Sequence, residues 1–388
     1  MTAAKMSAWK GRFPRNEIIS LLDVNRRHNL AESTSRNLRV GELVELLGGF
    51  DTVRELELGY GTSAGLPALR EAVAADSGVG ADNVITTQGT SLGLFLLAFE
   101  LCRPGDRAAL VTPCFPPSRN ALIACGVEID EVSLGFDESY QIDPDRIARC
   151  LSPRTRMVSI ANPQNPSGVR TPENLMHLVL DVMAKRAPNA FLFVDETYRA
   201  ATYGDEPVPP SVAAIDPRVI VGSSVSKAYG APGLRVGWLI TRDAALRDQL
   251  IVAKLNTVIS GSVLDEGLAA GLLTAGQAAL STRRHHLNRA LDALARWHGC
   301  ESHRVDWVCP QGGALCCLRL RRDVFDATAV TRFWAALPPN ELQLASGEWF
   351  GDVEGGRVFR LGFGFLPELG LEPALAALSV TMDAVLAA

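Results

Sequence analysis

Lys227 stands in the most chemically unusual setting in the sequence. It lies in the segment GSSVSKAYGAPGLRVGW, directly after an apolar run that predicts a buried strand, and Arg235 follows eight residues later. Burial in a cationic pocket lowers the pKa of a lysine, so that its amine can attack a carbonyl group and form a Schiff base. A lysine that merely extends its ammonium group to the surface would look the same in isolation, so the neighbouring motifs decide.

Three polar residues elsewhere in the chain could act on a heteroaromatic ring bound to that lysine. Asp195 ends the apolar run FLFVD, Tyr198 follows three residues later, and Asn165 lies in NPQNPSG. A carboxylate at a strand end can pair with a pyridinium nitrogen and keep it protonated, while tyrosine and asparagine can donate to a phenolic oxygen. Each also has a simpler interpretation, with Asp195 as a helix cap and NPQNPSG as a proline-rich turn.

Other residues near these segments could bind a phosphate group. Gly89 and Thr90 lie between the predicted strand VITT and a predicted helix, and Ser224 and Arg235 flank Lys227. Free amides at a helix start, hydroxyl groups and a cation are the groups that hold a phosphate. An ordinary helix cap would explain Gly89 and Thr90 equally well when they are considered alone.

Two further side chains have a shape that suits a small ligand. Phe115 follows a predicted strand and could stack on a heteroaromatic ring, although a core position is the usual place for such an aromatic residue. Arg360 lies in a predicted strand near the C-terminal end, and its guanidinium could bind a carboxylate in a bidentate way. A surface ion pair is the simpler interpretation of an isolated arginine.

The elements that must position these residues alternate between helix and strand from about residue 65 to 240. This order predicts crossover connections and a mostly parallel sheet that is buried on both faces. Polar clusters follow five of the strands, and open sheets of this kind bind ligands at the carboxyl ends of their strands. We therefore expect one cleft between predicted strands at 84–87, 108–112, 157–161, 191–195, 219–224 and 236–241, with helices at 66–75, 91–101 and 173–185.

The pattern changes after the predicted sheet. Residues 243–298 are predicted to be mainly helical with an interruption near 260–262, and short strands at 316–320 and 357–363 then alternate with helices at 326–336 and 371–387. This suggests a smaller α+β domain, on which the first 45 residues are expected to pack. The predicted domains are 46–288 for the large one, and 1–45 plus 289–388 for the small one.

Composition excludes several other classes of protein. The 388 residues carry a net charge of −5, which leaves no basic face for nucleic acid. The eight cysteines form no Cys-x-x-Cys pair and are expected to be free thiols, and the six histidines show no His-Glu-x-x-His zinc motif. With no secretory signal and no apolar run of ~20 residues, the sequence predicts a cytoplasmic protein without a membrane partner or a metal.

Taken in order, the motifs resemble the class I and II aminotransferases, which are pyridoxal 5'-phosphate (PLP) enzymes of fold type I. The resemblance covers nearly the whole chain and implies an α/β fold with a large, mostly parallel α/β/α domain and a smaller α+β domain. Where the family usually has proline before the glycine that corresponds to Gly347, this chain has Ser346. The matching segments are YGTSAGLPALREAVA (60–74), NPQNPSG, DETY, SSVSKAYGAPGLRVGW, and GEWFG (347–351) followed by VFRLGF.

The resemblance assigns a role to each candidate residue. Lys227 would carry PLP as a Schiff base and move a proton, with Asp195 and Tyr198 also catalytic, and the enzyme would transfer an amino group from an amino acid to a 2-oxo acid. Substrate binding would fall to Arg360, Asn165 and Ala31. The implied cofactor-binding residues are Lys227, Asp195, Tyr198, Asn165, Phe115, Gly89, Thr90, Ser224, Arg235 and, from the neighbouring subunit of a homodimer, Tyr60.

A narrower resemblance leaves the reaction type open. NLAESTSRNLRVGELVEL (29–46) and DETYRA are similar to a bacterial branch that includes capreomycidine synthase-like and arginine-oxidising PLP enzymes. The alternative function is therefore a cyclase, lyase or oxidase that acts on a basic amino acid in specialised metabolism. Glu32 could favour a cationic substrate side chain, although a glutamate that faces solvent is the expected interpretation.

Two hydrolase motifs and one regulatory interpretation compete with this assignment. Gly61–Gly65 satisfies G-x-S-x-G, but the preceding VRELEL is charged at alternate positions, whereas the motif needs a buried strand before it. Ser224–Lys227 satisfies S-x-x-K, but the companion segments S-D-N and K-T-G are absent. A PLP-binding sensor domain of a transcription regulator is disfavoured because no DNA-binding segment is expected before residue 45.

Overall fold

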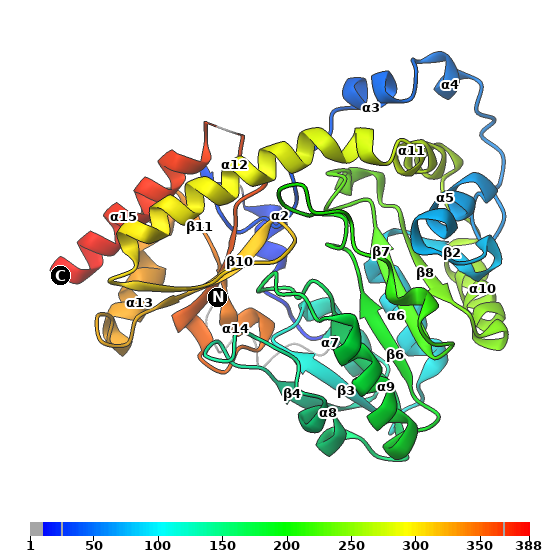
Figure 1. Ribbon diagram of the computed structural model, residues 1–388, viewed down its shortest axis with the longest axis horizontal. Helices are drawn as coiled ribbons and strands as arrows, with labels where there is room; N and C mark the ends of the chain where they lie inside the picture. The colour runs from blue at the N-terminus through cyan, green and yellow to red at the C-terminus, as the bar shows by residue number, and fades with distance from the viewer. Residues whose placement is uncertain (1–10, 25, 368) are drawn as a thin grey trace.

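The computed structural model describes residues 11–24, 26–367 and 369–388, and in it a large sheet and a smaller one lie side by side (Figure 1). The large sheet has seven strands among the described residues, and all run parallel except β8, which is antiparallel to its neighbours β2 and β7. This confirms the predicted, mostly parallel sheet. Its strands, in spatial order, are β2 (Val84–Thr87), β8 (Gly237–Thr241), β7 (Val219–Ser224), β6 (Phe191–Asp195), β5 (Thr155–Ala161), β3 (Arg107–Thr112) and β4 (Glu128–Ser133).

Helices cover both faces of the large sheet. Successive residues of a strand point to opposite faces, so each strand packs against helices on both sides. Leu192 packs in one apolar cluster and Phe193 in another, and Ala109 and Ala108 divide in the same way. One face is covered by α6 (Gly89–Leu101), α7 (Pro116–Ala124) and α10 (Ala244–Val258). The other face is covered by α5 (Pro67–Ser77), α8 (Pro144–Cys150), α9 (Glu173–Arg186) and α11 (Val263–Thr274).

The smaller sheet is antiparallel and lies towards the C-terminal end of the chain. Its four strands among the described residues are, in spatial order, β12 (Ala345–Ser346), β13 (Val358–Gly362), β10 (Leu315–Leu320) and β9 (Val305–Val308). The predicted strands at 316–320 and 357–363 are therefore present, whereas β9 and β12 were not predicted. The helices of this part are α12 (Gln277–Glu301), α13 (Ala327–Ala336), α14 (Gly347–Phe350) and α15 (Leu371–Ala387), and α12 lies beside α15 (Figure 1).

The first 45 residues contact the smaller part, as expected, and also the large one. Strand β1 (His28–Asn29) pairs with β11 (Leu342–Gln343), but the ring of Phe13 lies 5.6 Å from that of Phe95 in α6. Leu47, just beyond these residues, packs closely against Gly271 of α11. The short helices of this N-terminal region are α2 (Ile19–Asp23), α3 (Val40–Leu46) and α4 (Asp51–Arg54).

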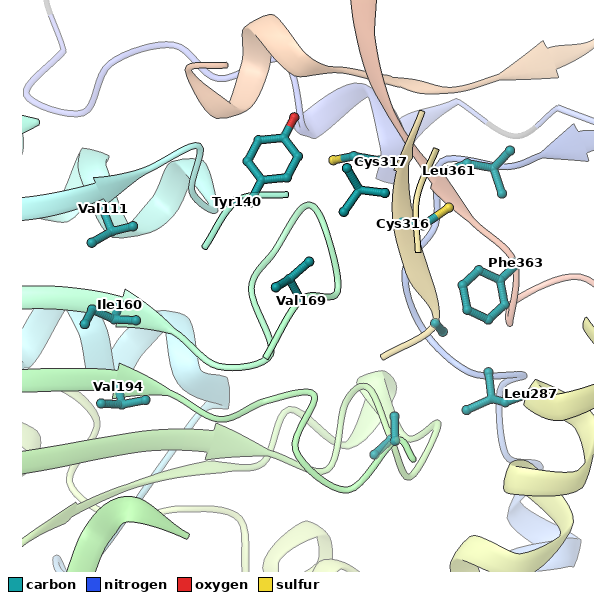
Figure 2. Packing of buried hydrophobic residues seen from close by; sticks show 14 of the residues in the cluster. Val111, Tyr140, Ile160, Val169, Val194, Leu287, Cys316, Cys317, Leu361 and Phe363 are labelled. Atoms are coloured by element: carbon teal, nitrogen blue, oxygen red, sulfur yellow. The ribbon is translucent and has the colours of Figure 1, made fainter. Parts of the chain in front are cut away.

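One apolar core joins the two sheets. Figure 2 shows Val111, Ile160 and Val194 of the large sheet on one side, and Cys317 and Phe363 of the smaller part on the other. These residues belong to a single cluster of buried side chains. Helix α12 also runs without a break through residue 288, so the domain boundary at that position stays a prediction.

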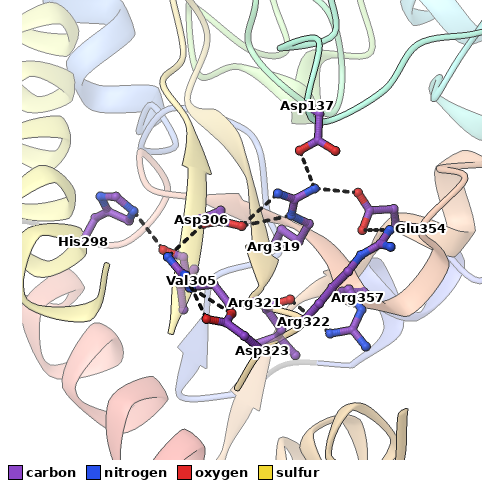
Figure 3. A network of polar contacts seen from close by, with 11 residues as sticks. Asp137, His298, Val305, Asp306, Arg319, Arg321, Arg322, Asp323, Glu354 and Arg357 are labelled. Atoms are coloured by element: carbon purple, nitrogen blue, oxygen red, sulfur yellow. Dashed lines mark hydrogen bonds and ion pairs between the residues drawn. The ribbon is translucent and has the colours of Figure 1, made fainter. Parts of the chain in front are cut away.

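A polar network also joins the same two parts. Figure 3 shows Arg319 of β10 between Asp137, which follows β4, and two carboxylates of the smaller part, Asp306 and Glu354. The three distances from guanidinium nitrogen to carboxylate oxygen are 2.8, 2.9 and 2.8 Å. The guanidinium also lies 4.4 Å above the ring of Phe136.

All eight cysteines are free thiols, as expected, and Cys102, Cys114, Cys316 and Cys317 are buried. Among the described helices, none combines the length and the apolar character needed to cross a membrane.

Candidate active site

A cavity of about 790 Å³ opens at the carboxyl ends of the large sheet. Side chains that follow five different strands reach it, as the polar clusters of the sequence predicted. The segment 29–37 and Arg360 of β13 close it from the side of the smaller part. Most of the predicted site residues line this one cavity, namely Thr90, Phe115, Asn165, Asp195, Tyr198, Ser224, Lys227, Arg235 and Arg360.

Lys227 lies in the turn that follows β7 and extends its ammonium group into the cavity. Its Nζ is 3.2 Å from Glu32 Oε1 and 3.3 Å from Ser33 Oγ, and the side chain is 25% exposed. Ser33 Oγ is in turn 2.9 Å from the hydroxyl of Tyr198. The serine hydroxyl therefore connects the amine and the phenol that the sequence predicted to act together.

Asp195 is the last residue of β6, and its carboxylate points to the same cavity. Its Oδ1 accepts hydrogen bonds from the backbone N (3.0 Å) and from Oγ1 (2.5 Å) of Thr197. Burial raises the pKa of Asp195, and the bonds from Thr197 and the charge of Lys227 only partly oppose that effect. A buried carboxylate of this kind gains stability from a cationic partner, which a protonated ring nitrogen would supply.

The predicted phosphate-binding residues gather at the start of α6. This helix begins at Gly89, so Gly89 and Thr90 lie in its first turn and not before it, but the first N–H groups of a helix still lack intrahelical partners. A Cβ on Gly89 would overlap Nη2 of Arg235, and one on Gly237 would lie 2.7 Å from the backbone N of Thr90. A guanidinium thus lies against a positive helix end, which favours an anion between them.

Arg360 is buried in β13, and its guanidinium is held in one orientation. Nη1 donates to Asn165 Oδ1 (3.0 Å) and Nη2 to the backbone carbonyl of Ala31 (2.6 Å), while the ring of Phe350 lies 4.9 Å from the central carbon. Its Nε has no partner among the described residues. Because a guanidinium carries five N–H donors, several stay available for a carboxylate.

Ser346 occupies the position at which the resembled family usually has proline. The structure shows it as the N-cap of α14, where Oγ accepts a hydrogen bond from the backbone N of Glu348 at 3.3 Å. A serine cap starts this short helix by satisfying one of its free amides. Ala345, the preceding residue, pairs with Arg360 across the sheet, so the segment keeps Arg360 in register.

Glu32 does not face solvent, and the expectation that it would was wrong. It lines the cavity with a side chain that is 18% exposed, and its Oε1 also accepts hydrogen bonds from the backbone N of Ser33 (2.8 Å) and Thr34 (3.0 Å). Burial raises the pKa of Glu32, but the charges of Lys227 and Arg360 and the hydrogen bonds outweigh this effect and lower it. The carboxylate therefore stays ionised inside the cavity.

Tyr60 is not brought to this cavity in the single chain. It is 88% exposed and lies in a separate hollow of about 650 Å³ with residues 58–59 and 258–263. The predicted crossing of Tyr60 to a neighbouring subunit stays a prediction.

Sequence reasoning missed Ser33 and Thr197. The run E-S-T-S after Ala31 and the Asp-x-Thr pattern at 195–197 were the available signals, since a hydroxyl two residues after an aspartate often bonds back to it. The described residues between α4 and α5 form no strand, so the segment Gly61–Gly65 lacks the strand that a nucleophile elbow requires.

Comparison with known proteins identifies close similarities over most of the chain. Residues 54–351 match the family model of aminotransferase class I and II. The chain is 30% identical to valine–pyruvate aminotransferase of Mycobacterium tuberculosis, over 79% of each chain, and 30% identical to capreomycidine synthase of Streptomyces vinaceus, over 90% of this chain and 88% of that one. The crystal structure of a PLP-dependent aminotransferase from Streptococcus suis superposes with a TM-score of 0.86 at 23% identity, over 96% and 99% of the two chains.

Proposed function

Because this chain belongs to the class I and II aminotransferases, a family of PLP-dependent enzymes of fold type I, we propose that it transfers the amino group of an amino acid to a 2-oxo acid. The observation that supports this proposal best is the shared cavity. It gathers a lysine, a carboxylate at a strand end, and two arginines on opposite sides. These are the groups that an amino acid and PLP would need.

The residues present fit PLP at both ends. Arg235, the amides at the start of α6 and the hydroxyls of Thr90 and Ser224 would hold its phosphate, since glycine at 89 lets the arginine approach the helix end. Asp195 would pair with the ring nitrogen, and Lys227 would hold the cofactor through a Schiff base. Asn165 Oδ1 is already used by Arg360, so its Nδ2 donor can turn to the phenolic oxygen.

Bound PLP supplies an electron sink that stabilises negative charge at the substrate Cα. Arg360 would bind the α-carboxylate and so place Cα near Lys227, whose free amine would accept the Cα proton. Ser33 would hold that amine through its hydrogen bond, and Tyr198 would in turn hold the hydroxyl of Ser33. Ile18, Leu21 and Phe365 line the cavity with apolar groups that reduce access of water.

The lysine assignment has a direct test. Lys227→Ala should lose the visible absorption band of bound PLP and all measurable amino transfer, because no other lysine lines the described cavity. The band is recorded by spectrophotometry and the transfer by oxo-acid formation. Lys185→Ala, which changes an exposed lysine of α9, is the control and should keep both. Retention of band and turnover in Lys227→Ala would contradict the assignment.

A second candidate function is that of a PLP-dependent cyclase, lyase or oxidase acting on a basic amino acid. The ionised carboxylate of Glu32 inside the cavity favours it, as does the similarity to capreomycidine synthase. A panel of amino acids with and without 2-oxoglutarate separates the two functions. Turnover that needs the oxo acid supports transamination, whereas release of ammonia or peroxide without it supports the alternative.

A further inference from the structure

We propose that Glu32 is a positioning residue for Lys227: its carboxylate holds Nζ in the cavity and favours the ammonium form of the amine whenever Nζ carries no cofactor. The inference rests on the proposed role of Lys227 as the cofactor-binding lysine. It gives Glu32 a task that is independent of the chemical class of the amino-acid side chain.

The contact itself is short and enclosed. Oε1 of Glu32 lies 3.2 Å from Lys227 Nζ, and the two side chains are 18% and 25% exposed. The same oxygen accepts the backbone N–H groups of Ser33 and Thr34, which fix its position independently of the lysine. The position of the carboxylate therefore does not depend on its contact with the lysine.

The backbone around Glu32 is held from both sides of the cavity. Towards the smaller part, a Cβ on Gly362 would overlap the carbonyl oxygen of Glu32, and Arg360 donates to the carbonyl of Ala31. Towards the large sheet, the backbone N of Ser35 donates to the carbonyl oxygen of Lys227 at 3.3 Å. A movement of either chain segment would therefore carry the other with it.

Among the described residues, Glu32 is the carboxylate that pairs with the lysine. Asp195 also acts on Lys227, but its Oδ1 is engaged by Thr197, and Arg235 and Arg360 are the other charged groups of the cavity. An amine must be neutral to attack an aldehyde, while an adjacent carboxylate stabilises the protonated amine. Glu32 should therefore set the pH above which the lysine captures PLP.

The test is the substitution Glu32→Gln in the full-length protein freed of cofactor. Glutamine keeps a carbonyl oxygen for the amides of Ser33 and Thr34 but removes the charge. The rate of appearance of the visible PLP band is measured as a function of pH. We expect the half-maximal pH to fall, because the protonated amine loses the negative charge that stabilises it. Glu45→Gln, the same change on the exposed side of α3, should leave the profile where it is.

Two results would overturn the inference. One is an unchanged half-maximal pH in Glu32→Gln with a smaller amplitude, which would assign Glu32 to the turn alone. The other is a loss of turnover restricted to basic amino acids, which would assign it to substrate selection. If Glu32→Gln does not fold, Glu32→Asp retains the charge at a longer distance and should give a smaller shift in the same direction. A wild-type protein without any PLP band would refute the proposed function instead.

Discussion

The guanidinium of Arg360 is bound by three groups of the protein before any substrate arrives. Asn165 and the carbonyl of Ala31 accept its hydrogen bonds, and Phe350 lies against its face. Its orientation is thus decided by residues from three other places in the chain. A planar fork held in this way can meet both oxygens of a carboxylate, which the single ammonium of a lysine cannot do.

We expect Arg360→Lys to raise KM for the amino acid by roughly 10- to 100-fold, because a hydrogen bond to a charged group contributes ~1.5–3 kcal/mol. The effect on kcat should be smaller, since the proton-transfer groups are unchanged. Steady-state kinetics at a saturating 2-oxo acid concentration measure both constants. Arg357→Lys, whose arginine donates to the backbone carbonyls of Leu320 and Phe325, should leave KM unaltered. Equal KM values in the two variants would mean that another group binds the carboxylate.

Single residues were predictable where a local motif carries them. Lys227 and Asn165 each follow a strand and Asp195 ends one, all in recognisable segments, and the structure brings them to one cavity. Glu32 was interpreted wrongly because its partner, Lys227, lies 195 residues away in the sequence. The segment E-S-T-S gives no sign that the fold brings the two residues together. Contacts between distant segments depend on the whole fold, so they cannot be inferred from neighbours in the chain.

At the scale of elements, the start of α6 depends on a backbone that a side chain would disturb. Gly89 has a φ of +74°, and a Cβ there would overlap the guanidinium of Arg235. Gly78, the C-cap of α5, has a similar φ of +68°, but a Cβ added to it would meet no atom of the described residues within 4 Å. Replacing each glycine with alanine therefore distinguishes the effect of backbone strain, common to both positions, from that of crowding Arg235, which occurs only at position 89.

Gly89→Ala and Gly78→Ala should each lose ~1–2 kcal/mol of stability from the left-handed backbone conformation. Only Gly89→Ala should also weaken PLP binding, by on the order of 10-fold, because Arg235 must move away from the helix end. Urea unfolding measures the first effect, and titration of the cofactor-free protein with PLP measures the second. Equal PLP affinities would show that the phosphate does not bind at α6.

Elements with strong apolar runs were predicted well, and polar ones were not. Strands β6 and β7 and helix α15 have the predicted bounds. Strand β4 was missed because its sequence EIDEVS is charged, which suits an edge strand that faces water. Strand β9 (VDWV) was missed because an aspartate interrupts its short apolar run.

At the scale of the whole molecule, the Arg319 network joins the large sheet to the smaller part. Arg319 is 14% exposed and meets three carboxylates, of which Glu354 is 9% exposed. Arg321, directly after β10 (Figure 3), is 37% exposed; it pairs with Asp323 at 2.9 Å and reaches Asp306 only at 3.8 Å. Substituting each arginine in turn therefore compares an enclosed ion pair with an exposed one in the same region.

Arg319→Met should lower the free energy of unfolding by ~3 kcal/mol, because it leaves the enclosed carboxylate of Glu354 with a weaker set of partners. Arg321→Met should leave stability nearly unaltered, since solvent and salt screen an exposed pair. Urea unfolding midpoints of the two variants provide the comparison. Similar losses in both would mean that the network does not tie the two parts together.

The exposure of Tyr60 has a genetic consequence if the residue serves a neighbouring subunit. A subunit with Lys227→Ala still offers an intact Tyr60, and one with Tyr60→Ala still offers an intact Lys227. Random pairing of the two would give mixed dimers with one undamaged site, and hence about a quarter of the wild-type activity. Co-expressed at limiting PLP, two defective alleles should complement each other, whereas no gain over the single variants would place Tyr60 outside the site. The activity of a site would then depend on the alleles that encode both subunits, and not on one allele alone.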